Sequence, residues 1–160
     1  MRLENIARWK KALLVLVLFE VLFGVLMILI AFSDNTYPIL DMRLAYNFDT
    51  FKEAMNLEGV RLYMVLFRLL DMVFPIAYVW FFLVITENKL YVKIAIVFAA
   101  IFDYIENVMQ VVYLFLEDHD VFQMILLISV TWMKFAWLGI AILFTIYYYI
   151  NNHLEKRKQS

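Results

Sequence analysis

The chain contains no cysteine and very little histidine, glycine or proline. Without cysteine it forms no disulfide, carries no thiolate nucleophile and offers no sulfur ligand to zinc or an iron–sulfur cluster. Its two histidines, His119 and His153, lie outside the long apolar segments, which excludes a histidine-rich metal site within those segments. Three glycines give no phosphate-binding glycine loop. We therefore expect no cofactor.

Charge is also scarce and almost balanced. The net charge of −1 over 160 residues gives no reason to expect a nucleic-acid partner. Hydrophobic residues make up 66% of the chain, whereas soluble domains have roughly 45–50%. Together with a mean hydropathy of +0.79, this composition predicts an integral membrane protein whose main surroundings are membrane lipid.

Four apolar segments lie near 12–32, 62–85, 91–116 and 121–150. Each is long enough for a hydrocarbon layer about 30 Å thick, which needs roughly 20 helical residues. The first segment exceeds the roughly 7–15 apolar residues of a secretory signal, so we expect it to be a retained span. The predicted fold is all-α: residues 1–160 form a single integral membrane domain built as a four-helix transmembrane bundle.

The loops between these segments differ in Lys and Arg content. Basic residues gather before the first segment, at Lys89 and Lys93, and in the C-terminal tail, but are absent from 117–120. Because Lys and Arg favour the cytoplasmic side, we expect both termini in the cytoplasm and the protein in the plasma membrane.

The first outer loop, about 33–61, contains an amphipathic pattern. Its apolar residues recur at spacings of three and four: Leu40, Leu44, Phe48, Phe51 and Met55. This spacing predicts a helix lying on the outer membrane surface. Thr50 and Glu53 fit a capping box at its start, and Gly59 fits a stop signal. An ordinary interfacial helix without a functional role fits the pattern equally well.

Charged side chains interrupt the apolar segments at Glu20, Arg68, Asp71, Asp103, Glu106 and Lys134. An unpaired charge at the bilayer centre costs on the order of 2.5–3.5 kcal/mol. Asp103, Glu106 and Asn107 share one helical face with Gln110, and Arg68 lies one turn from Asp71. At ~1.5 Å per residue, all six charges lie ~9–21 Å below the outer surface. We expect a buried ligand site formed by Glu20, Arg68, Asp71, Asp103, Glu106, Asn107 and Lys134.

The acids in the spans outnumber the bases four to two, so either two acids carry protons or the site attracts a cation. The first interpretation is a pocket for a cationic or polar ligand, such as a lipid headgroup. The alternative is a structural or partner-binding protein with an internal ion-pair network. In that network Asp71 or Glu106 would pair with Arg68, and Asp103 or Glu20 with Lys134. The third is an intramembrane enzyme with an acid/base carboxylate pair, for which no catalytic residue can be assigned.

Two motifs carry a resemblance to known proteins: Asp71-x-x-Phe74-Pro75-x-x-Tyr78 and Asp103-Tyr104-x-Glu106-Asn107. Together they resemble a group of uncharacterised small bacterial four-span membrane proteins, a resemblance that implies no activity. The overall plan is also similar to the emopamil-binding/sterol-isomerase family, with four helices, a long first outer loop and Phe-Pro-Ile in the second span. That resemblance implies a lumen-side pocket for a sterol or a cationic amphiphile. The acidic strip of the third span departs from that family's pattern.

Overall fold

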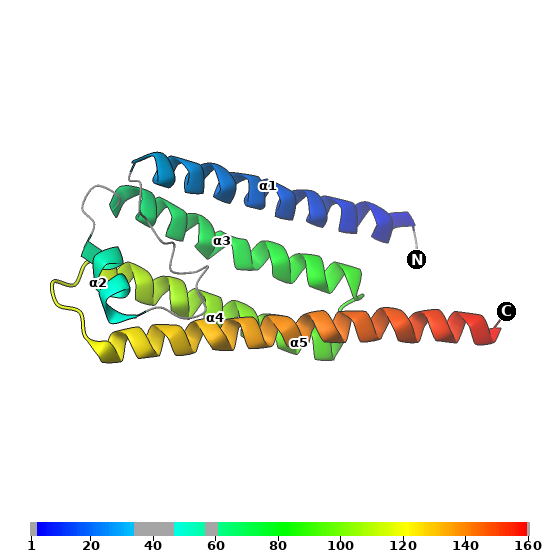
Figure 1. The fold of residues 1–160 in the computed structure, drawn as a ribbon. Coiled ribbons are helices and arrows are strands. Elements are labelled where there is room, and N and C mark those ends of the chain that lie inside the picture. Colours follow the sequence, from blue (N-terminus) through cyan, green and yellow to red (C-terminus); the bar gives the residue numbers. More distant parts are fainter. Residues whose placement is uncertain (1–2, 34–46, 57–60, 160) are drawn as a thin grey trace.

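The computed structural model describes residues 3–33, 47–56 and 61–159. They form five helices in the order α1 (Leu3–Ser33), α2 (Phe48–Asn56), α3 (Arg61–Ile85), α4 (Leu90–Leu114) and α5 (Val121–Gln159) (Figure 1). These ranges contain no strand. The all-α prediction is therefore confirmed.

Three of the helices are long and apolar enough to cross a membrane. They are α3 over Val65–Ile85, α4 over Leu90–Leu114 and α5 over Val121–Glu155. Large apolar side chains such as Leu69, Ile105 and Leu143 are exposed on them. An apolar outer surface of this kind suits lipid. The helices also satisfy their backbone hydrogen bonds internally, so no backbone polar group is exposed to lipid along them. These features fit an integral membrane protein.

The long helices pack in the order α1, α3, α4, α5, so that neighbours in this order lie side by side (Figure 1). The face of α4 toward its neighbours carries Ala95, Ala99 and Ala100, all buried. Such small residues let helices approach closely in a membrane. Pro75 lies within α3 and is buried; it removes one backbone hydrogen bond, the one to the carbonyl of Asp71.

Two apolar clusters form the core, one toward each end of the helices. The cluster beside α2 consists of Phe23, Phe51, Phe67, Tyr113, Leu114 and Leu127. The cluster toward the chain termini consists of Tyr78, Ala95, Ile96, Ala99, Ala100 and Ala141. On α3, α4 and α5 alike, the residues between these two clusters are the polar ones of 68–71, 103–110 and 131–134. The core is therefore apolar, polar and apolar again along the helix direction.

The short helix α2 lies across one end of α4 and α5, beside the connection between them (Figure 1). Phe51 is fully buried there, with its ring 6.0 Å from that of Tyr113 and 5.6 Å from that of His119. The Thr50 amide donates to the side-chain oxygen of Asn47 at 2.8 Å. Asn47 therefore caps α2, and the predicted capping box of Thr50 and Glu53 is wrong.

The amphipathic helix is found over Phe48–Asn56. Leu40, Leu44 and Gly59, which the sequence pattern also included, lie outside the described residues.

A tight connection joins α3 to α4. Glu87 and Asn88 both have positive φ, 52° and 60°, a conformation in which Asn is tolerated better than most residues. The Asn88 amide donates to the carbonyl of Leu83 at 2.9 Å, which closes the end of α3. The turn fixes the antiparallel pairing of the two helices that carry most of the polar side chains.

Candidate functional site

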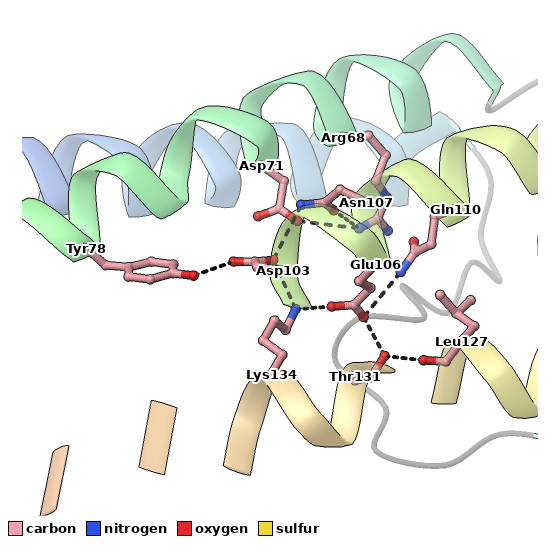
Figure 2. A network of polar contacts seen from close by, with 10 residues as sticks. All are labelled: Arg68, Asp71, Tyr78, Asp103, Glu106, Asn107, Gln110, Leu127, Thr131 and Lys134. Atoms are coloured by element: carbon pink, nitrogen blue, oxygen red, sulfur yellow. Dashed lines mark hydrogen bonds and ion pairs between the residues drawn. The ribbon is translucent and has the colours of Figure 1, made fainter. Parts of the chain in front are cut away.

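The polar side chains of α3, α4 and α5 meet in one buried network between the two apolar clusters (Figure 2). Arg68, Glu106 and Asn107 have no solvent-accessible surface, and Asp103 is 4% exposed. Buried polar groups need partners, because each one without a hydrogen bond costs free energy. The network supplies those partners from three different helices.

Lys134 on α5 bridges two carboxyl groups of α4. Its ammonium lies 3.4 Å from Oδ1 of Asp103 and forms an ion pair with Oε2 of Glu106. The two acids are three residues apart on α4, so one ammonium can reach both. Of the two pairings that the sequence left open for Lys134, the structure shows the one with Asp103 and adds Glu106.

Arg68 on α3 connects the remaining acid to α4. Its Nη1 lies 3.6 Å from Oδ2 of Asp71, one turn further along the same helix, as the spacing predicted. The same nitrogen donates to Oδ1 of Asn107 at 3.4 Å, and the Asn107 amide donates to Oδ1 of Asp103 at 3.4 Å. Asn107 therefore links the Arg68–Asp71 pair to the carboxyl group that Lys134 contacts.

Three further side chains complete the network, and the sequence analysis did not place them in the site. The Tyr78 hydroxyl donates to Oδ2 of Asp103 at 3.1 Å, and the Gln110 amide donates to Oε1 of Glu106 at 3.4 Å. The Thr131 hydroxyl lies 2.6 Å from Oε1 of Glu106. Each had a signal in its spacing: Tyr78 lies two turns after Asp71, Gln110 one turn after Glu106 and Thr131 one turn before Lys134.

The Thr131 hydroxyl has two oxygen neighbours but one proton. Besides Glu106, it lies 3.0 Å from the backbone carbonyl of Leu127 (Figure 2). A hydroxyl donates once and accepts through its lone pairs. It can therefore donate to an ionised Glu106, or accept from a protonated Glu106 while donating to Leu127.

Glu20 is not brought to this network. It is exposed on α1, whose inward face consists of the buried Ala12 and Phe23 and the partly buried Leu16, Phe19 and Leu26. That face packs on α3, with the rings of Phe19 and Phe74 5.8 Å apart. A helix turns by about 100° per residue, so Glu20 points away from the direction that Phe19 takes. The other six predicted site residues, Arg68, Asp71, Asp103, Glu106, Asn107 and Lys134, are brought together.

No metal-binding arrangement of three or more His, Asp or Glu side chains occurs within the described ranges. The chain matches no protein-family model, no curated protein and no solved structure. The likeness to four-span bacterial proteins and to the sterol-isomerase family therefore stays a prediction. What the chain does must be argued from the buried network itself.

Proposed function

We propose that this chain is a four-helix membrane protein whose buried network binds a cationic or polar ligand. Support for a fourth span comes from α1, which contains the apolar segment 12–32 and packs beside α3. The distribution of Lys and Arg among the loops supports cytoplasmic termini. In this orientation α2 and the connection 115–120 lie on the outer side, and the network lies between that side and the bilayer centre.

The charge balance of the network is the observation that carries the binding proposal. Among the described residues it holds three carboxyl groups, Asp71, Asp103 and Glu106, and two cationic groups, Arg68 and Lys134. When all five are ionised, one negative charge is left over in a region of low dielectric. An uncompensated buried charge costs several kcal/mol, so this region favours the uptake of one positive charge.

A proton is the smallest cation that could supply this charge, and the contact of Glu106 with Thr131 provides for its uptake. With Glu106 ionised, Thr131 donates to Oε1. With Glu106 protonated, the carboxyl donates to Thr131, whose own proton turns to the Leu127 carbonyl. Both states keep the contact between Glu106 and Thr131 hydrogen-bonded without moving a heavy atom. An ammonium donating to the same oxygen could take the place of the proton.

A ligand with both charges would use the basic residues as well. Its phosphate or carboxylate would replace an acidic partner of Arg68 or Lys134, and the released acid would hold the ligand's ammonium. Zwitterionic lipid headgroups have this chemistry and are present at high concentration around every membrane protein. Lipid is therefore the first organic ligand to test.

The test is a thermal-unfolding series on purified protein in detergent. We expect small cations, primary amines or phospholipid to raise the Tm of the wild type. Glu106→Gln and Asp103→Asn, which keep side-chain volume, should lose that rise. Asp118→Asn removes an exposed carboxyl outside the network and serves as the matched control. Equal shifts in the wild type and both network variants would contradict the binding proposal.

A second candidate function is an internal scaffold, favoured by the contacts that the network side chains make with one another across α3, α4 and α5. Arg68, Glu106 and Asn107 have no exposed surface, and Lys134 bonds two acids at once. On this proposal the charges fix which helix faces meet, and no ligand is required. The unfolding series separates the two, because a scaffold predicts no ligand-dependent rise in Tm.

A further inference from the structure

The exposed side of α1 carries a carboxyl group at mid-membrane depth. Counting along the apolar segment 12–32, Glu20 lies ~12 Å from its inner end and ~18 Å from its outer end. The residue is exposed, and its neighbours Val21 and Leu22 are exposed apolar residues. The inference drawn from this observation rests on the function proposed above, in which α1 crosses the membrane. A carboxyl group in that position would face lipid unless another helix covers it.

Glu20 belongs to a stripe with the spacing of a helix-packing seam. The stripe consists of Leu13, Val17, Glu20 and Gly24, separated by four, three and four residues. Such a repeat keeps side chains in line along one helix. Leu13 and Val17 are 40% and 50% exposed, and a Cβ built on Gly24 would meet no atom within 4 Å. The stripe therefore has room for a helix, and Gly24 lets its backbone come close.

The charge of Glu20 indicates what chemistry the covering helix needs. Within the described membrane segments the basic residues away from the helix ends are Arg68 and Lys134, and both are engaged in the buried network, whereas Lys93 lies in the first turn of α4. The other described basic side chains lie toward the ends of helices, such as Lys10, Lys89 and Arg157. A second copy would bring the same arrangement, and so no further cation at this depth from its described residues. The complementary charge has to come from a different chain.

We propose that the stripe Leu13, Val17, Glu20 and Gly24 binds a transmembrane helix of another protein that carries a lysine or arginine near the bilayer centre. The partner's cation pairs with Glu20, and its backbone packs over Gly24. Since lipid offers no water to either charge, the pair is favoured over two separate charges in lipid.

The test uses the full chain in phosphatidylcholine vesicles. Because the chain has no cysteine, one cysteine introduced at exposed Lys10 takes a single fluorescent donor. The probe is a synthetic leucine- and alanine-rich transmembrane helix with one central lysine and an acceptor dye. We expect energy transfer to report association about tenfold tighter than for the same helix with leucine at the centre. Glu20→Leu should abolish this preference.

A relocation variant supplies the matched control. Exchanging Glu20 with the exposed Leu22, that is Glu20→Leu combined with Leu22→Glu, keeps the composition and the charge but moves the carboxyl group about 200° around the helix, away from the stripe; it should not restore the preference. Gly24→Leu should weaken binding of both probes by closing the open space. Equal binding of the lysine and leucine probes to the wild type would overturn the proposal. So would association of two labelled copies that depends on Glu20 without any probe.

Protease protection of α1 in the same vesicles keeps this inference separate from the proposed topology. Loss of protection would overturn both together. Protected α1 with no lysine preference would overturn the docking surface alone. The ligand-dependent Tm of the buried network does not involve Glu20 and is unaffected by either result.

Discussion

Lys134 is the residue on which the buried network depends, because its ammonium contacts both Asp103 and Glu106. Replacing it by methionine keeps an unbranched chain of similar length and removes the charge. We expect Lys134→Met to destabilise the fold by roughly 3–5 kcal/mol, since removing one partner leaves buried charge uncompensated. Unfolding of the purified protein by a denaturing detergent measures the loss.

The partner substitution tests whether this cost comes from pairing. Combining Lys134→Met with Glu106→Gln or with Asp103→Asn removes an acid together with the base, and should recover much of the lost stability. If neither double variant is more stable than Lys134→Met alone, the ammonium does not stabilise the fold by neutralising these acids.

Thr131 offers a second test, because its hydroxyl lies 2.6 Å from a fully buried carboxyl oxygen. Thr131→Val keeps the shape of the side chain and removes the hydrogen bond. We expect a loss of about 1–3 kcal/mol, because Oε1 of Glu106 loses the shorter of its two described hydrogen bonds and keeps the longer one from Gln110. Ser129→Ala is the control: Ser129 bonds only the carbonyl of Ile125 among the described contacts and is exposed. It should change stability by less than about 0.5 kcal/mol. Equal effects of the two substitutions would contradict the role given to Thr131.

The sequence correctly predicted contacts that depend on the spacing of residues along one helix. It did not predict contacts that depend on how the helices pack. The Arg68–Asp71 pair follows from a separation of three residues on one helix. The direction of Glu20 does not follow in the same way. The segment around it is apolar on all sides, so no amphipathic face marks which side packs on α3.

At the scale of elements, the positions where helices begin and end depend on helix propensity and capping, which the hydropathy of the sequence does not predict. The apolar segment at the C-terminus ends near residue 150, but α5 continues to Gln159. The tail is rich in Leu, Glu, Lys, Arg and Gln, which all have good helix propensity. The helix therefore continues beyond the end of its apolar segment. At α2 the Thr50–Glu53 pattern predicted the wrong start, because Asn47 three residues earlier supplies the capping oxygen.

Phe51 is the side chain that holds α2 to the rest of the molecule. It is fully buried against Tyr113 and His119, whereas Lys52 and Glu53 beside it are exposed. A nine-residue helix is too short to be stable alone, so we expect Phe51→Ala to release it. Amide hydrogen exchange should speed up strongly over 48–56 while the amides of α4 stay protected. Lys52→Ala is the control and should leave exchange unchanged. Loss of protection in α4 as well would show that α2 is part of the main cooperative unit.

For the whole molecule, the sequence predicted that a polar layer exists but not which helices contribute to it. Helical faces and depth counting predicted that charges on different segments would meet at one level. The order of packing decided which of them did: among the described helices, α3, α4 and α5 share the layer, whereas α1 packs on α3. Packing order is a property of the assembled core, in which aromatic contacts such as those of Phe23 with Phe67 and Phe74 place α1.

Topology is the prediction that concerns the chain as a whole, and the absence of cysteine makes it directly measurable. Single cysteines at Asp118, Lys89 and Arg157 occupy exposed positions at the α4–α5 connection, the α3–α4 connection and the tail. Because Lys and Arg mark the cytoplasmic side, a membrane-impermeant maleimide should label Asp118→Cys on intact cells. Lys89→Cys and Arg157→Cys should react after the membrane is permeabilised. Labelling of the tail from outside would reverse the orientation. The buried network would then lie nearer the cytoplasmic surface, and any ligand it binds would have to enter from that side.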